Sequence, residues 1–256
     1  MNLEAHLRDV RAKNRKILAP YVTGGLGSDW TDAVRACIDN GADALEISIP
    51  FSDPLMDGPV IQAANQRALD HGAIPDDILK GIAALDAPVP LLIMTYYNVV
   101  HHYGHERFAR ACADRGVAGT IIPDLPFDEG GDWIAAAESH GVENVLLVAP
   151  STTDTRLVDI CERTRGFVYS VAHMGVTGER VAIADETVTT AARIQAVTDK
   201  PVLIGFGISG PNQAAAAAQH ADGVIVASAL VRRLLEGESA DDVGAFVQSL
   251  RAAIDA

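Results

Sequence analysis

A single glutamate stands inside a run of apolar residues and could carry acid–base chemistry. The run is Ala44-Leu45-Glu46-Ile47-Ser48-Ile49-Pro50. A lone carboxylate in such a run is costly unless it is hydrogen-bonded or has a chemical task. Burial would raise the pKa of the Glu46 carboxyl, which suits a group that gives and takes protons near neutral pH. We therefore favour a catalytic Glu46 over a core carboxylate that is satisfied by a backbone or tyrosine donor.

The loop after this run holds two more carboxylates, Asp53 and Asp57. Its Asp57-Gly58 pair is typical of a turn, and Pro59 is well placed at the start of a helix. Taken alone, both aspartates would be turn or cap residues. Together with Glu46, which lies in the preceding run, they predict a paired-carboxylate site. One carboxyl would be buried and exchange protons, and the other would stay ionised on the loop.

Two later segments could bind an anion through the backbone. Gly205-Phe206-Gly207-Ile208-Ser209 follows one apolar run, and Val226-Ala227-Ser228-Ala229-Leu230 follows the next and opens a helix. Glycine lets a ligand approach the backbone closely, and the start of a helix offers N–H groups to an anion. A lone G-x-G pattern is equally typical of a tight turn. Its place after a late strand of a barrel would favour phosphate binding.

The elements that must position these residues are eight apolar runs alternating with segments of helical period. The runs are not interrupted by regular polar positions, which is typical of parallel strands covered on both faces. Eight strand–helix units in about 250 residues predict an α/β fold, a single (β/α)8 TIM barrel spanning residues 1–256. Residues 1–13 are expected to add a helix over the N-terminal mouth. The expected strands are 17–22, 44–49, 90–97, 119–122, 144–148, 167–171, 201–205 and 223–226.

The expected helices are 29–40, 76–85, 105–115, 129–140, 154–164, 186–198, 211–220 and 240–253. A doubly wound open sheet is the structural alternative, but Tyr21–Leu26 lacks the spacing of a dinucleotide-binding turn. In barrels the chemistry lies on the loops that follow each strand. Glu46, the acidic loop and both anion-binding segments fall at such positions.

Composition excludes several classes of protein. The chain has 256 residues, 20 Lys plus Arg against 34 Asp plus Glu, a net charge of −14 and 48% apolar residues. An apolar content of this size excludes a disordered chain, and the acidity argues against nucleic acid or an anionic membrane as a partner. We find no signal peptide or membrane-length apolar run, so a cytoplasmic protein is expected. Cys37, Cys112 and Cys161 are expected to be buried free thiols.

The densest histidine cluster is His101-His102-x-x-His105. A zinc-binding helix would need an accompanying glutamate and an unbroken helix between the two outer histidines, and Gly104 interrupts that spacing. A solvated loop or a partner surface is favoured over a metal site.

The acidic loop belongs to a longer pattern. The segment Leu45-Glu46-Ile47-x-Ile49-Pro50-Phe51-Ser52-Asp53-Pro54-Leu55-x-Asp57-Gly58-Pro59-x-Ile61-Gln62 strongly resembles the signature of the tryptophan synthase α subunit family. The resemblance extends over the whole chain. It includes Pro20–Thr23, Tyr96–Asn98, Ile122–Pro126, Gly175–Gly178 and Gly205–Ser209.

The resemblance implies a lyase of L-tryptophan biosynthesis that uses no cofactor or metal. It would cleave indole-3-glycerol phosphate by a retro-aldol reaction to indole and glyceraldehyde 3-phosphate. Glu46 would be the principal acid and base, and Asp57 would accept the indole N–H. Thr177, in a lid over the site, would bind Asp57 on closure. Tyr169 would lie beside Glu46, and Tyr21 and Ile225 would line the indole pocket. The phosphate would be held by the backbone amides of Gly178, Gly207, Ile208, Ala227 and Ser228, and Phe206 would be a further substrate-binding residue.

The resemblance also implies a partner, the pyridoxal-phosphate-dependent β subunit, which receives the indole in a heterotetramer of two α and two β subunits. Asp53, Pro54 and Asn98 would lie near that interface. The chain departs from the family pattern at Met56, Val60, Ala227 and the stretch 172–174, and none of these departures removes a catalytic group. Ala227 adds a methyl group that is tolerable where φ stays negative.

Three other functions are compatible with the sequence. The first is a stand-alone lyase that releases free indole. The second is a catalytically weak or silent paralogue that binds and regulates a β-like partner, against which the intact Glu46, Asp57, Thr177 and Gly207 argue. The third is a barrel enzyme acting on a phosphorylated sugar or isoprenoid, for which no lysine stands at the C-terminal end of an expected strand.

Overall fold

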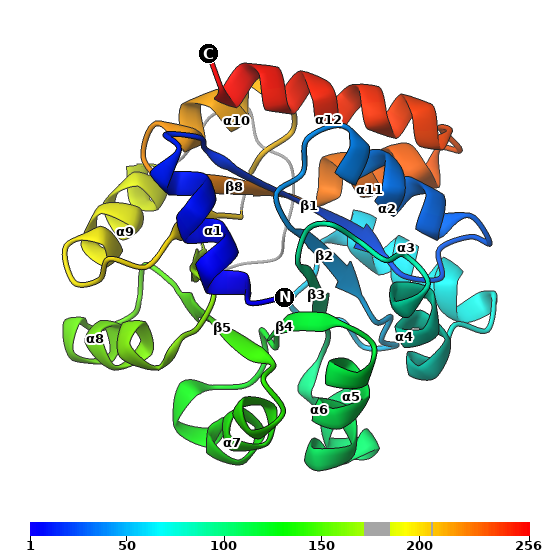
Figure 1. Ribbon diagram of the computed structural model, residues 1–256, viewed down its shortest axis with the longest axis horizontal. Coiled ribbons are helices and arrows are strands. Elements are labelled where there is room, and N and C mark those ends of the chain that lie inside the picture. Colours follow the sequence, from blue (N-terminus) through cyan, green and yellow to red (C-terminus); the bar gives the residue numbers. More distant parts are fainter. Residues whose placement is uncertain (172–184, 206) are drawn as a thin grey trace.

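Eight parallel strands close into a barrel in sequence order, with helices around it (Figure 1). The computed structural model describes residues 1–171, 185–205 and 207–256. The strands are β1 Ile17–Thr23, β2 Leu45–Ser48, β3 Leu91–Met94, β4 Val117–Ile121, β5 Glu143–Val148, β6 Val168–Ser170, β7 Val202–Ile204 and β8 Gly223–Val226. The (β/α)8 barrel predicted from the sequence is therefore confirmed.

The helices lie between the strands and at both ends of the chain. They are α1 Leu3–Ala12, α2 Trp30–Asp39, α3 Pro59–Asp70, α4 Pro75–Ala83, α5 Tyr97–Tyr103, α6 His105–Asp114, α7 Gly131–Ser139, α8 Asp154–Arg163, α9 Asp185–Gln195, α10 Pro211–Ala218, α11 Ser228–Leu235 and α12 Ala240–Ile254, with a short 3-10 helix at Phe127–Glu129.

The third strand is shorter than the sequence predicts. The expected strand ran over 90–97, but β3 ends at Met94 and Tyr97 already begins helix α5. Helix α5 contains two tyrosines and two valines, which favour a strand locally, so tertiary packing overrides their propensity here. Gly104, with φ of +89°, separates α5 from α6.

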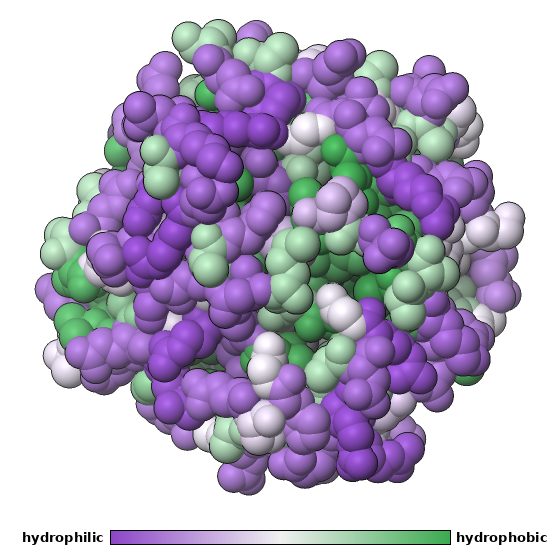
Figure 2. All heavy atoms as spheres, in the orientation of Figure 1, coloured by the Kyte–Doolittle hydropathy of each residue, from purple (hydrophilic) through white to green (hydrophobic). Residues whose placement is uncertain are grey.

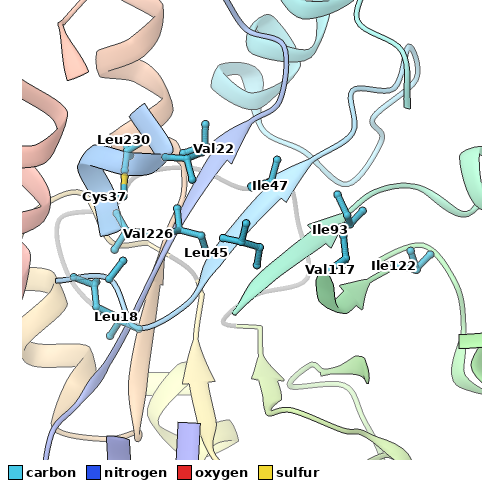
Figure 3. Close-up of a cluster of buried hydrophobic side chains, with 14 of the residues drawn as sticks. Leu18, Val22, Cys37, Leu45, Ile47, Ile93, Val117, Ile122, Val226 and Leu230 are labelled. Carbon is cyan, nitrogen blue, oxygen red and sulfur yellow. The ribbon is translucent and has the colours of Figure 1, made fainter. Parts of the chain in front are cut away.

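The strands are apolar throughout because their alternate residues enter two different cores. Residues that point away from the barrel, such as Leu18, Val22, Ile47 and Val226, pack against helical residues that include Cys37 and Leu230 (Figure 3). Residues that point inward form a second cluster with the first helix. That inward cluster includes Ile17, Ala19, Leu92, Ile121, Phe167, Leu203 and Ile225, together with Leu3, Leu7 and Val10.

Helix α1 closes the N-terminal end of the barrel, as predicted. Leu3 and Leu7 are fully buried against the inward-facing strand residues. The N–H groups of Leu3 and Glu4 donate to the Glu143 carboxylate at 2.8 and 3.0 Å, which satisfies two of the donors that a helix start leaves free. In Figure 1 this helix crosses in front of the strands.

The face that carries α1 is mostly hydrophilic, with a smaller group of apolar residues right of its centre (Figure 2). Cys37, Cys112 and Cys161 are buried free thiols, as predicted. Within the described ranges, the longest helices are too short or too polar to cross a bilayer.

Candidate active site

Glu46 lies on β2 with its side chain inside the barrel. Its register partners are Tyr21 on β1 and Leu92 on β3. Leu45 and Ile47 on either side of it pack outward, and this alternation turns Glu46 inward. Only 1% of Glu46 is exposed, and neither carboxylate oxygen has a hydrogen-bond partner among the described residues.

Burial raises the pKa of Glu46 from 4.5 to about 8. At neutral pH this carboxyl is therefore mostly protonated, ready to donate. The alternative that Glu46 is a satisfied core carboxylate is wrong, because no described donor reaches either oxygen. An unpartnered carboxyl at this depth costs free energy, which is expected of a group kept for chemistry rather than for stability.

A cavity at the C-terminal ends of the strands brings the sequence-predicted residues together. All nine that fall in the described ranges line it: Tyr21, Glu46, Asp57, Tyr169, Gly207, Ile208, Ile225, Ala227 and Ser228. Thr177, Gly178 and Phe206 lie outside the described residues. Ile61, Met94 and Gly205 also line the cavity; the sequence assigned no role to Ile61 and Met94, and it included Gly205 only as part of an anion-binding segment. Their positions at strand ends and on the helix after the acidic loop were the available signal.

Asp57 reaches the cavity from the acidic loop. Its own N–H donates to the carbonyl of Pro54 at 3.0 Å, which closes a turn, and Gln62 Nε2 donates to the Asp57 carbonyl at 2.8 Å. Burial raises the pKa of Asp57 from 3.8 to about 6, while a hydrogen bond from Tyr96 opposes that rise. Between these two carboxyls, Asp57 is thus the one that is mostly ionised at neutral pH.

Tyr96 is the contact partner of Asp57, and the sequence analysis missed this role. Its hydroxyl donates to Asp57 Oδ2 at 3.0 Å and accepts the N–H of Met56 at 3.0 Å. The ring stacks on Phe51 with centroids 5.3 Å apart. Two signals pointed to this position: its place just beyond β3, where the residues that carry barrel chemistry gather, and its membership of the Tyr96–Asn98 segment that resembles the family.

The backbone around the late strands suits an anion. Gly207 has φ of +76°, which favours glycine, and Ala227 has φ of −108°, so its methyl group is accommodated as expected. Ser228 is the first residue of α11, where the N–H groups lack acceptors within the helix. The described lining of the cavity contains no lysine or arginine, so these amides would be its donors to an anion.

The mouth beside the acidic loop carries exposed apolar residues. Leu55 is 82% exposed and Met56 is 47% exposed. Asp53 and Asn98, which the resemblance places near a partner, are exposed as well, and Pro54 is half-buried.

Comparisons with known proteins identify the family of this chain. The family model described as tryptophan synthase alpha chain matches residues 7–254. The tryptophan synthase alpha chain of Salinispora arenicola is 45% identical over 237 residues, which is 90% of this chain and 87% of the relative. That of Streptomyces coelicolor is 43% identical over 235 residues, 91% of this chain and 84% of the relative. A structure of Mycobacterium tuberculosis tryptophan synthase is 40% identical, with a TM-score of 0.92 over 98% of this chain and 97% of that one.

Proposed function

This chain belongs to the tryptophan synthase alpha chain family, and from that premise we propose how its cavity works. The chain is the lyase of tryptophan biosynthesis that cleaves indole-3-glycerol phosphate to indole and glyceraldehyde 3-phosphate. One observation supports the assignment most directly. A buried, unpartnered carboxyl, Glu46, shares a cavity with a second carboxyl, Asp57, whose pKa is lower.

Glu46 can complete the proton transfers alone. In its protonated form it donates to C3 of the indole ring, which places positive charge on the ring nitrogen. The resulting carboxylate takes the proton of the hydroxyl on the glycerol carbon that is bonded to C3, which is one end of the breaking bond. The C–C bond then breaks, its electron pair restores the indole ring, and the hydroxyl carbon becomes the aldehyde. Glu46 ends protonated, ready for another turnover.

Asp57 supplies the opposite charge. As a carboxylate it accepts the indole N–H and stabilises the positive charge that develops on the ring nitrogen. The role needs an ionised group, which fits a pKa of about 6 beside a Glu46 pKa of about 8. Two carboxyls with separated pKa values are a common arrangement for one acid and one ionised stabiliser.

Two different groups of cavity residues would bind the indole ring and the phosphate of the substrate. Tyr21, Tyr169 and Ile225, with Ile61 and Met94, would hold the indole ring. The amides of Gly207, Ile208, Ala227 and Ser228 would hold the phosphate. The proposal also includes Phe206 at the ring, Gly178 at the phosphate, and Thr177 as the lid residue that bonds to Asp57.

The family implies a β-subunit partner, and we place it at the cavity mouth. Leu55 and Met56 are exposed on the loop that carries Asp57, and with Asp53, Pro54 and Asn98 they would form the contact surface. A pyridoxal-phosphate-dependent β subunit seated there would receive indole as it forms, in a heterotetramer of two α and two β subunits.

The test is indole release from indole-3-glycerol phosphate by the purified chain, with and without a β subunit. Glu46→Gln and Asp57→Asn should each lower kcat by roughly a hundredfold or more, since each removes a proton carrier or a charge. The exposed Asp132→Asn is the matched control. Activity raised by the β subunit would support the α-subunit role.

High activity indifferent to the β subunit would instead favour a stand-alone lyase. A folded chain that binds the β subunit and releases no indole under either condition would overturn the proposal in favour of a regulatory paralogue.

A further inference from the structure

The Tyr96 hydroxyl joins two neighbouring parts of the acidic loop. It donates to the Asp57 carboxylate and accepts the Met56 N–H, both at 3.0 Å. A phenol has one proton to donate and can accept at its oxygen, so both bonds form at once. One side-chain atom therefore fixes a reacting group and the backbone beside it.

The two parts differ sharply in exposure. Asp57 is buried, whereas Leu55 and Met56 stand out from the surface at the turn that begins with Pro54. The Met56 N–H of this exposed turn is bonded to the same oxygen that donates to Asp57. Besides the backbone that joins Met56 to Asp57, the Tyr96 hydroxyl therefore links the exposed turn to the carboxylate itself.

Tyr96 itself is fixed by the barrel and by its packing against Phe51. It is buried, it directly follows Thr95 at the end of β3, and its ring stacks on Phe51. The Thr95 hydroxyl donates to the carbonyl of Ile49 at 3.3 Å, which ties the ends of β2 and β3 together. The hydroxyl is therefore a fixed point against which the loop is placed.

No described cation offsets the negative charge of Asp57. The titratable groups around it are Glu46 from β2, Tyr21 from β1 and Tyr169 from β6, while Asp124 acts on Tyr96 from beyond β4. Among the described side chains, Tyr96 is the one that donates a hydrogen bond to this carboxylate. Its removal would leave burial as the dominant influence on Asp57.

We propose that Tyr96 is a positioning residue for this reaction, whose hydroxyl holds Asp57 in place and makes its orientation depend on the Pro54–Met56 turn. The inference rests on the proposed function, because it assigns Asp57 its part in catalysis. A protein that binds the exposed turn acts on the carboxylate through the same hydroxyl.

The first test compares the pH dependence of kcat/KM in Tyr96→Phe and Tyr97→Phe. Tyr96→Phe removes only the hydroxyl and keeps the ring on Phe51. We expect kcat/KM at pH 7 to fall roughly tenfold to a hundredfold, and its acidic limb to move to higher pH, because the ionised Asp57 loses its donor. The Tyr97 hydroxyl contacts His105 instead, at 3.0 Å, so Tyr97→Phe should keep the wild-type profile.

The second test needs no substrate, and it separates this inference from the proposed function. NMR follows the Asp57 carboxyl carbon and the exchange of the Met56 amide hydrogen. In Tyr96→Phe we expect the Asp57 titration to shift to higher pH and the Met56 amide to exchange faster, while Tyr97→Phe changes neither.

The outcomes are distinct. If both Tyr96→Phe measurements equal those of the wild type, the inference is overturned whatever the activity. If they shift as expected while the wild-type chain releases no indole, Tyr96 still holds Asp57 and the proposed function alone fails.

Discussion

A Cβ atom on Gly205 would lie 2.2 Å from the Tyr169 hydroxyl oxygen, so the missing side chain at residue 205 is what makes room for the Tyr169 ring. Both residues line the cavity, and the Tyr169 hydroxyl donates to the Gly205 carbonyl at 3.4 Å. Gly205 is not in the left-handed region, so the requirement concerns space and not backbone torsion.

Gly205→Ala should therefore displace the Tyr169 ring within the substrate site. We expect kcat/KM to fall at least tenfold, and the free energy of unfolding to drop by about 1 to 3 kcal/mol through overpacking. Steady-state kinetics and urea denaturation measure the two effects. Gly131→Ala is the matched control, since nothing lies within 4 Å of a Cβ there. Wild-type kinetics in Gly205→Ala would show that the Tyr169 ring can accommodate a methyl group at residue 205 and would contradict this prediction.

The pH dependence of cleavage should follow the two carboxyls. The reaction needs Asp57 ionised and Glu46 protonated, and burial places their pKa values at about 6 and about 8. A plot of kcat/KM against pH should be bell-shaped, falling below about 6 and above about 8. Asp57→Asn should lose the acidic limb and keep the alkaline one. An alkaline limb that persists in Glu46→Gln would remove Glu46 from this role.

Burial of Glu46 should lower the free energy of unfolding of the protein at high pH. Its pKa rises from 4.5 to about 8 on folding, so between these values the native state holds a proton that the unfolded chain has lost. The free energy of unfolding should fall as pH rises through this window. The Glu46→Gln variant has no titrating carboxyl at this position, so its free energy of unfolding should not show this fall. Measured against the wild type, its free energy of unfolding should therefore rise by a few kcal/mol between pH 5 and pH 8.5.

Urea denaturation of both proteins across this pH range measures that difference. Glu129→Gln, at an exposed position, is the control. A pH-independent difference between Glu46→Gln and the wild type would mean that folding does not raise the pKa of Glu46.

Leu3 should contribute strongly to the stability of the protein, although it lies close to the N-terminus. It is fully buried, and Cβ atoms built on Gly119 and Gly166 would meet its side chain at 3.0 and 2.4 Å. Leu3→Ala should lower the free energy of unfolding by about 2 to 5 kcal/mol through the cavity that it leaves. Val158→Ala, at a 40% exposed apolar residue of α8, should change it by less than about 1 kcal/mol. Thermal or urea denaturation compares the two, and equal losses would mean that α1 does not seal the barrel.

The fold was predictable because the strand signal is local. Apolar runs such as Leu45–Ser48 and Gly223–Val226 mark strands buried on both faces, and a charge inside one of them, Glu46, is conspicuous. Helix α5 was not predictable, since its own residues favour a strand and only packing makes it helical. The residues alone indicated a paired-carboxylate site of Glu46 with the acidic loop and two anion-binding segments after late strands, and the family resemblance then assigned Asp57 and the phosphate amides their roles.

The contact between Tyr96 and Asp57 could not be read from the sequence. It joins residues 39 positions apart, and its geometry depends on how the turn at Pro54 folds back over the end of β3. Gly205 was quoted only as part of a glycine pattern, because its value lies in the volume left to Tyr169 on another strand. Both relationships are set by distances between segments far apart in the sequence, which no periodicity encodes.

Helix α1 determines by which end of the barrel substrate and products can pass. With Leu3 and Leu7 buried at the N-terminal end, the described part of the barrel is closed on that side. Substrate and products would therefore pass the opening on the C-terminal side. A neighbour docked over that opening would receive the indole as it leaves, and glyceraldehyde 3-phosphate would have to find its way around the same neighbour.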